Sequence, residues 1–420
     1  MKKSTPLHIL FLGIPSRGHT FPTLQLIKSL MQEGCKVTYF NTKDFKKSIE
    51  ASGALFVDYD SHTLSNITMP ITSMEPHDVT IDLQKIFFAS ALEIMPKIDF
   101  FHQQNNYNAV IYDQMALWGQ LLADKYKLLS FCSNTMFLFD KNYIINQMPK
   151  FLDRINHEYD AKLSVLSSSF PQLKSYKDIL DIQTATKSHY IITYYPENLH
   201  KTSINFNKEK IIYLGNRFNS QYFPSIKNFK AASTIYISLG TVFNEKPDLF
   251  KLFIDFFGKT KYKVIISTGS NDFIYTLIKN INTHNNIKIY KFINQVDILS
   301  RSSLFITHAG FNSMYEGLYF TVPMLMIPHV PEQYFNAQKV QELNAGHLLR
   351  EQDISSISLN KSLNDIETNW QLFKSFSIKI RDSFLKSNDN SKAAKQIISF
   401  INGDLAPERS PEGSSLSTFT

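Results

Sequence analysis

The sequence predicts an α/β protein built from two doubly wound domains, each with a parallel sheet. Short buried-strand patterns alternate with helical patterns in both halves of the chain, and the connections between them are short. At 420 residues the chain is also too long for one compact core. Two domains of similar design are therefore expected.

The N-terminal half opens with a complete strand–helix–strand unit. An apolar strand is expected over His8 to Gly13, and a helix with one apolar face over Thr20 to Glu33. Gly34 stands where a glycine commonly ends a helix, and a second strand, Lys36 to Phe40, follows at once. Such a unit implies a parallel sheet with a right-handed crossover.

Further along this half, an apolar strand over Asn108 to Tyr112 ends at Asp113. A helix from about Ala116 to Tyr126 and a strand from Leu128 to Cys132 are expected next. Residues 60–100 and 135–190 are less regular and contain several prolines. We expect both segments to be insertions at the carboxyl edge of the sheet, where ligands bind.

The C-terminal half repeats this scheme. The expected strands are Thr234 to Leu239, Lys263 to Thr268, Ile287 to Phe292, Leu304 to Thr307 and Met324 to Ile327, with helices at Asn312 to Phe320 and at Glu332 to Asn344, the latter closed by Gly346. The predicted organisation is an N-terminal domain (1–215), a linker (216–232), a C-terminal domain (233–385), a C-terminal helix (386–403) and a disordered tail (404–420).

Composition excludes several classes of protein. The net charge is +7 and the pI about 9.0, but no five basic residues are consecutive, which favours a solvated face over a nucleic-acid site. No stretch approaches 18 apolar residues, so no transmembrane segment is expected. Cys35 and Cys132 suit reduced thiols. A cytoplasmic protein, monomeric or a weak homodimer, is the resulting expectation.

The candidate general base is His19. It follows Gly18 at the entry to the first helix, where the helix dipole disfavours a cation and keeps the imidazole neutral. Asp113 follows another strand of the same parallel sheet, so the two residues can meet at its carboxyl edge. A hydrogen bond from Nδ1 to Asp113 would fix the tautomer and stabilise the imidazolium as it forms.

The candidate anion site is the segment from Thr307 to Glu316, between a strand and a helix of the second domain. Gly310 permits close approach of the backbone, and the unpaired amides at the helix start near Asn312 can bind a diphosphate. His308 and Ser313 can add hydrogen bonds to phosphate oxygens. Glu316 lies one turn into the helix, where its carboxylate could accept hydrogen bonds from the ribose hydroxyls.

The surrounding motifs extend this pattern. Phe292-Ile293-Asn294-Gln295 precedes the anion site, and Pro331-Glu332-Gln333 with Asn336-Ala337 follows it. With them the sequence resembles the family 1 glycosyltransferases, which include plant natural-product enzymes and bacterial macrolide and flavonoid glycosyltransferases. The resemblance implies the GT-B fold, two Rossmann-like domains facing across a cleft.

The resemblance also implies a role for each matching residue. Phe292, Ile293 and Gln295 would flank the uracil and ribose, and Glu332 and Gln333 would bind the sugar hydroxyls. The diphosphate would lie against His308, Gly310, Asn312 and Ser313, with Glu316 on the ribose, and Ser238, Gly240 and Thr241 match a further diphosphate-side loop. Two residues depart from the family pattern: Asn294 replaces a proline, and Phe292 replaces a frequent tryptophan.

The implied activity is inverting transfer of a sugar, glucose by preference, from a UDP-sugar to a hydroxyl of a small hydrophobic acceptor, with no cofactor and no metal. Asp58-Tyr59-Asp60 matches a metal-binding Asp-x-Asp motif but lacks its context, so a solvated turn is expected. The alternatives are a sugar-nucleotide epimerase, a membrane-surface lipid glucosyltransferase and a catalytically silent helper protein.

Overall fold

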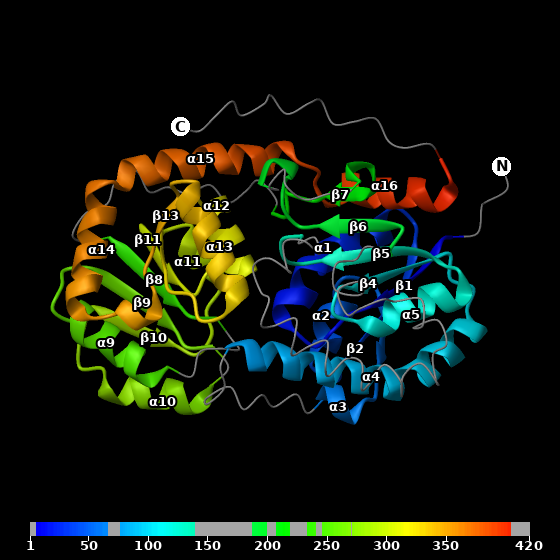
Figure 1. The fold of residues 1–420 in the computed structure, drawn as a ribbon, viewed down its shortest axis with the longest axis horizontal. Helices are drawn as coiled ribbons and strands as arrows, with labels where there is room; N and C mark the ends of the chain where they lie inside the picture. The colour runs from blue at the N-terminus through cyan, green and yellow to red at the C-terminus, as the bar shows by residue number, and fades with distance from the viewer. Residues whose placement is uncertain are drawn as a thin grey trace. The chain divides into compact units, whose positions relative to one another are not determined.

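The computed structural model describes residues 6–65, 76–138, 187–199, 207–218, 233–240, 246–269 and 271–404 (Figure 1). The chain divides into two compact units. The first comprises Met1–Met69, Asp78–Arg217 and Leu385–Thr420, and the second comprises Pro70–His77 and Phe218–Phe384. Each unit is an α/β layer structure around its own sheet.

The first unit contains a seven-stranded sheet in which every neighbouring pair is parallel. Its order is β3-β2-β1-β4-β5-β6-β7. The strands are β1 (His8–Leu12), β2 (Lys36–Asn41), β3 (Leu55–Asp58), β4 (Ala109–Asp113), β5 (Leu129–Asn134), β6 (Tyr190–Thr193) and β7 (Ile211–Tyr213).

Among the described residues, the helices that precede β6 are α1 (Arg17–Gln32), α2 (Lys46–Glu50), α3 (His62–Ser65), α4 (Pro76–Gln104) and α5 (Leu117–Tyr126). The long helix α4 corrects the expectation of an irregular segment over residues 60–100. Pro76 begins this helix instead of interrupting it, since proline is well tolerated in a first helical turn. Of the other expected insertion, residues 139–186 lie outside the described part of the chain.

The second unit contains a six-stranded parallel sheet in the order β10-β9-β8-β11-β12-β13. Its strands are β8 (Thr234–Ser238), β9 (Lys263–Ser267), β10 (Ile287–Tyr290), β11 (Leu304–Thr307), β12 (Met324–Met326) and β13 (Gly346–Leu348). Its helices are α9 (Pro247–Phe257), α10 (Asp272–Ile281), α11 (Gln295–Leu299), α12 (Phe311–Tyr319), α13 (Pro331–Glu342), α14 (Ser356–Thr368) and most of α15 (Trp370–Lys386).

The end of α13 differs from the expected one. The helix was expected to run to Asn344 and to be closed by Gly346, but it stops at Glu342, and Asn344 adopts a left-handed conformation with φ +50°. Asparagine tolerates this conformation better than most residues. Gly346 instead begins β13, where an added Cβ would lie 2.5 Å from the backbone oxygen of Met324.

The last helix, α16 (Asn390–Asn402), belongs to the first unit although it follows the second in sequence. The ring of Phe400 stacks on Tyr190 with centroids 3.9 Å apart, and Lys395 pairs with Glu33, the C-cap of α1, at 3.7 Å. The segment expected as a separate C-terminal helix therefore packs within the N-terminal unit. Residues 219–232 of the expected linker and 405–420 of the expected tail lie outside the described part.

Both sheets reverse their winding direction at one point, between β1 and β4 in the first unit and between β8 and β11 in the second. In open α/β sheets, ligands bind at the carboxyl ends of the strands beside such a switch point. His19 and Asp113 follow β1 and end β4, and Gly240 and His308 follow β8 and β11. The fold thus brings each set of candidate residues to one switch point.

Candidate active site

His19 and Asp113 are in direct contact in the first unit. His19 is the third residue of α1, and its Nδ1 lies 2.8 Å from Oδ2 of Asp113, the last residue of β4. Asp113 is 1% exposed, and its Oδ1 accepts a hydrogen bond from the Met115 backbone N–H at 2.9 Å. A carboxylate only accepts hydrogen bonds, so the proton of the neutral imidazole is on Nδ1 and its lone pair is on Nε2.

Thr135 is a third member of this group that the sequence did not indicate. Its hydroxyl oxygen lies 3.0 Å from Nδ1 of His19, and the residue is buried just beyond the end of β5. The adjacent strands β4 and β5 pair Asp113 with Ser133, which brings Thr135 to the same edge of the sheet. No motif distinguishes this threonine from the others in the sequence.

The candidate anion site of the second unit is a tight connection between β11 and α12. Ala309 has φ +62°, Gly310 is the N-cap, and the helix begins at Phe311, one residue before the expected Asn312. The buried side chain of Asn336 donates a hydrogen bond to the carbonyl oxygen of Ala309 at 2.9 Å. Asn336 thus holds the left-handed backbone at Ala309 that leads into the start of α12.

The imidazole of His308 lies against Gly240 and Gly310. A Cβ added to Gly240 would lie 2.6 Å from its Nε2, and one added to Gly310 would lie 2.4 Å from the same atom. Burial and the neighbouring His329 lower the pKa of His308 to about 3, although a hydrogen bond with the Ser238 backbone acts in the opposite direction. His308 is therefore neutral at pH 7 and can only hydrogen-bond to phosphate, so the helix terminus must supply the positive potential.

The expected ribose-side residues form a hydrogen-bonded group. Gln295, at the start of α11, donates from Nε2 to Glu316 at 2.7 Å and lies 3.4 Å from the hydroxyl of Ser313. Asn294, which departs from the family pattern, caps α11 by accepting from the backbone N–H of Asp297. Phe292 is 47% exposed, so its ring can still stack on a base, and Ile293 follows it beyond the end of β10.

Glu332 and Gln333 lie in the first turn of α13, but both already have partners in the protein. Glu332 accepts a hydrogen bond from Asn336. Gln333 is 3% exposed, and its Oε1 accepts from the backbone N–H of His329 at 2.9 Å. Gln333 was expected to bind a sugar hydroxyl, and the oxygen of its amide already accepts this hydrogen bond within the protein.

The remaining predicted residues belong to the loop after β8. Ser238 is the last residue of that strand and Gly240 has φ +86°, while Thr241 lies outside the described residues. Beyond this loop, Lys246 pairs with Glu351 at 2.6 Å, and Glu351 pairs with Nδ1 of His329 at 2.7 Å. Although burial raises the pKa of Glu351, hydrogen bonds from His329 and Lys246 lower it to about 2. No motif in the sequence indicates that these three side chains meet.

No metal centre emerges within the described residues, where no three His, Cys, Asp or Glu side chains gather as ligands. Asp58 and Asp60 of the Asp-x-Asp motif pair separately, with Lys43 at 3.4 Å and with Lys97 at 3.7 Å. Both cysteines are buried free thiols. In the described part of the chain no helix is both long enough and apolar enough to span a bilayer.

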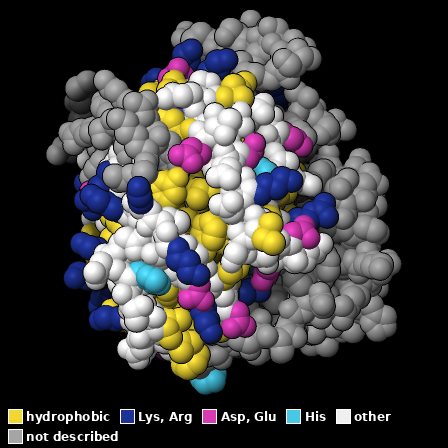
Figure 2. Space-filling model, turned by 90° about the vertical axis from the view of Figure 1, so that its left-hand side faces the viewer, with side chains coloured by type: hydrophobic (Ala, Val, Ile, Leu, Met, Phe, Trp, Pro, Cys, Tyr) yellow, Lys and Arg dark blue, Asp and Glu magenta, His cyan; other side chains and the backbone are white. Residues whose placement is uncertain are grey.

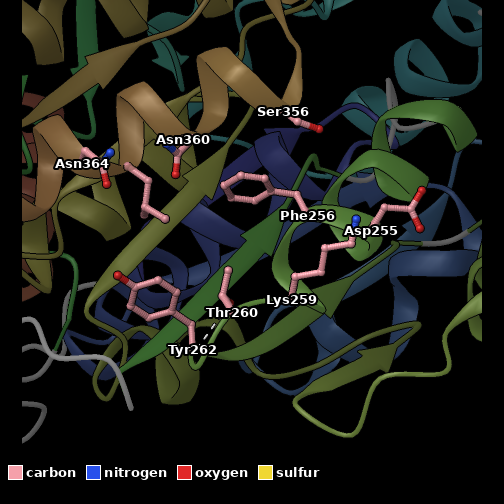
Figure 3. A pocket seen from close by; sticks show the side chains of 9 residues that line it. Asp255, Phe256, Lys259, Thr260, Tyr262, Ser356, Asn360 and Asn364 are labelled. Carbon is pink, nitrogen blue, oxygen red and sulfur yellow. Dashed lines mark hydrogen bonds between the residues drawn. The ribbon is translucent and has the colours of Figure 1, made fainter.

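A separate surface groove of about 370 Å³ lies between α9 and α14 (Figure 3). Its lining includes Thr260 and Tyr262, which lead into the amino end of β9, whereas the candidate residues follow the carboxyl ends of strands. The groove contains none of the predicted site residues. On the face drawn in Figure 2, basic and acidic side chains are interspersed around a band of hydrophobic side chains.

Comparison with known proteins identifies the family to which the chain belongs. Residues 102–380 match the sequence model of the family described as UDP-glucoronosyl and UDP-glucosyl transferase. The chain is 28% identical to the uncharacterized UDP-glucosyltransferase YdhE of Bacillus subtilis, over 94% of this chain and 98% of that protein. It is 21% identical to the oleandomycin glycosyltransferase of Streptomyces antibioticus, over 86% of this chain and 83% of that protein.

Solved structures show the same fold. The calicheamicin glycosyltransferase CalG4 superposes with a TM-score of 0.78 at 21% identity, covering 96% of this chain and all of that one. The glycosyltransferase VinC, solved in complex with dTDP, superposes with a TM-score of 0.69 at 13% identity, covering 94% of this chain and all of that one. The two parallel α/β units are therefore those of the GT-B fold, and the chain belongs to the UDP-glucoronosyl and UDP-glucosyl transferase family of nucleotide-sugar-dependent glycosyltransferases.

Proposed function

We propose that this glycosyltransferase moves glucose from UDP-glucose to a hydroxyl group of a small hydrophobic acceptor, with inversion at the anomeric carbon. The observation that carries the proposal is the contact between His19 and Asp113 at the start of α1. A histidine in this environment is suited to accept a proton from an acceptor hydroxyl. Family membership and the UDP-glucosyltransferase among its relatives support the donor.

In the proposed reaction, Nε2 of His19 takes the proton of the acceptor hydroxyl while that oxygen attacks the anomeric carbon. Asp113 accepts the hydrogen bond from Nδ1–H, which keeps the lone pair on Nε2 and stabilises the imidazolium that forms. The start of α1 disfavours a cation at His19 before the reaction. The positive charge therefore develops only as the proton is transferred.

The bond that breaks joins the anomeric carbon to the diphosphate, and UDP leaves with the electron pair. The backbone amides at the start of α12, together with neutral His308 and the hydroxyl of Ser313, would stabilise the negative charge on UDP. Because a helix terminus can serve in this way, we propose that the reaction needs no metal. A single displacement inverts the centre, so an α-linked donor gives a β-glycoside.

The acceptor class is supported by the names of a relative, the oleandomycin glycosyltransferase, and of a structural neighbour, the calicheamicin glycosyltransferase CalG4. An apolar acceptor pocket would suit aromatic or polyketide-like scaffolds such as flavonoids and macrolides. Biosynthesis and inactivation of such a compound are both compatible with this chemistry.

The test is incubation of the purified protein with UDP-glucose and a panel of phenolic, flavonoid and macrolide acceptors, with and without EDTA. Mass spectrometry should detect acceptors that gain one hexosyl group, and NMR should assign a β-linkage, with equal yield in EDTA. An α-linked product would contradict the single displacement. Failure with the soluble panel but glucosylation of a diacylglycerol or sterol in vesicles would overturn the acceptor class.

A further inference from the structure

Three side chains from three loops at the carboxyl edge of the second sheet are linked by ion pairs: Lys246 and His329 both contact Glu351. Met326 of β12 pairs with Leu348 of β13, and His329 and Glu351 each lie three residues beyond that pair. Lys246 immediately precedes α9, after the loop that follows β8. The nitrogen–oxygen distances are 2.7 Å between His329 and Glu351 and 2.6 Å between Lys246 and Glu351.

The contact with Glu351 is the one that orients His329. Because a carboxylate cannot donate, Nδ1–H of the histidine donates to it, and Nε2 makes no hydrogen bond among the described residues. The side chain of His329 is 3% exposed. A buried ring with one hydrogen bond loses its orientation when that partner is removed.

The backbone of His329 in turn determines which atom of Gln333 is available. Its N–H donates to Oε1 of Gln333 at 2.9 Å, and since an N–H can only donate, the oxygen of that amide must face it. The Nε2 group of Gln333 is the end left to bind a ligand. Gln333 is thus held as a hydrogen-bond donor.

From these contacts we infer that Glu351 is a positioning residue for sugar recognition: through His329 it holds Gln333 so that its Nε2 donates to a sugar hydroxyl oxygen. The inference rests on the proposed function, in which Gln333 binds the transferred sugar. It adds Lys246, His329 and Glu351 to the residues that determine donor affinity. With only Nε2 available, Gln333 can bind only those sugars that place a hydroxyl oxygen where it accepts a hydrogen bond from this group.

The first test compares Glu351→Ala with Glu351→Gln by calorimetry with UDP and with UDP-glucose. Loss of one well-placed hydrogen bond predicts about a tenfold weaker Kd for UDP-glucose in Glu351→Ala, and a change below about twofold for UDP alone. Glu351→Gln keeps an oxygen that accepts from His329 and should stay within about threefold of wild type. In steady state, the alanine variant should raise the donor KM more than it lowers kcat.

Asp365→Ala is the matched control, because it breaks another histidine–carboxylate pair of this unit, with His347 at 3.5 Å. It should leave both Kd values unchanged. Equal weakening of UDP and UDP-glucose in Glu351→Ala would assign Glu351 a merely structural role. Unchanged UDP-glucose affinity in Glu351→Ala would also overturn the inference.

A second measurement needs no ligand. In protein labelled with ¹⁵N-glutamine, the side-chain amide signal of Gln333, assigned by its loss in Gln333→Glu, should move in Glu351→Ala and stay in place in Asp365→Ala. An unmoved signal contradicts the positioning role. If the signal moves but the wild-type protein binds UDP and UDP-glucose equally, the inference about Gln333 holds and the sugar site of the proposed function is wrong.

Discussion

Nδ1 of His19 lies 2.8 Å from Oδ2 of Asp113, although the two residues are 94 positions apart in the chain. The contact exists because α1 follows β1, β4 ends at Asp113, and these two strands are neighbours in the parallel sheet. Asp113 uses its second oxygen to accept from the Met115 backbone. Both carboxylate oxygens are therefore engaged by donors, which determines how the pair should respond to substitution.

His19→Ala should lower kcat by about 10²–10⁴-fold, the range expected for loss of a general base. Its affinity for UDP should be unchanged, because the donor residues belong to the other unit. Rapid-quench or steady-state assays with UDP-glucose, combined with calorimetry of UDP, measure the two effects. His62→Ala, on α3, is the control and should behave as wild type; turnover above about a tenth of wild type in His19→Ala would exclude His19 as the base.

Asp113→Asn should lower kcat by at least about a hundredfold, since the asparagine has one oxygen for two donors. If that oxygen keeps the Met115 N–H, the amide NH₂ faces Nδ1 of His19 and selects the tautomer with its proton on Nε2. That tautomer cannot act as the base. The pH dependence of kcat should therefore change as well as its magnitude, and an unaltered profile would argue against tautomer control.

The sequence was sufficient to predict the two parallel-sheet units and the pairing of His19 with Asp113, because both follow from strand order and from what ends each strand. It was insufficient to predict the contact of Thr135 with His19 or the ion pair between Lys246 and Glu351. Those contacts depend on side chains from loops with no characteristic spacing. Helix α4 was missed because proline at its start resembles a break.

In the donor site, His308→Ala combined with Ser313→Ala should raise the donor KM by at least about tenfold, as two hydrogen bonds to the diphosphate are lost. The imidazole also fills the space beside Gly240 and Gly310, so its removal loosens the anion site itself. Calorimetry with UDP measures the effect directly. Asn364→Ala, in the groove beside α14, is the control, and normal UDP affinity in the double variant would remove this helix terminus from the donor site.

The lowered pKa of His308 predicts how stability depends on pH. The group has an ordinary pKa of 6.5 in the unfolded chain and about 3 in the folded one, so between these values the unfolded chain binds the extra proton. Stability should therefore fall as the pH decreases from 6.5 toward 3, by up to about 1.4 kcal/mol per pH unit from this residue. The effect is absent above pH 6.5.

Urea unfolding of wild type and His308→Ala at several pH values from 7 to 5 isolates this contribution. The variant should lose less stability than wild type over that range, even if it is less stable at pH 7. Glu351 does not interfere, because its pKa is lowered from 4.5 to about 2 and its effect begins only at lower pH. Parallel curves for the two proteins would mean that His308 is protonated normally in the folded state.

Gln333 shows why a motif alone does not define a site. The sequence pattern predicted that Gln333 binds sugar hydroxyls. In the structure its oxygen accepts from the His329 backbone, a contact that depends on the loop conformation before α13. Asn336, in the same motif, supports the carbonyl of Ala309. Some residues of one motif are therefore expected to contact the donor, and others support the backbone that binds it.

The last prediction concerns the sugar. Glu332 and Gln333 lie in the first turn of α13, and a carboxylate with a donating amide suits adjacent equatorial hydroxyls such as those of glucose. An axial 4-hydroxyl would leave one buried partner unpaired, at a cost of about 1–3 kcal/mol, or one to two decades in kcat/KM. UDP-glucose should therefore outperform UDP-galactose and dTDP-deoxysugars, with UDP-N-acetylglucosamine the closest competitor. The exposed phenyl ring of Phe292 makes the base preference weaker, so dTDP-glucose should also react. Specificity constants for these donors with one phenolic acceptor provide the measurement, and Gln333→Ala should reduce the preference for glucose over galactose. Equal constants for glucose and galactose in the wild-type enzyme would remove Glu332 and Gln333 from the sugar site.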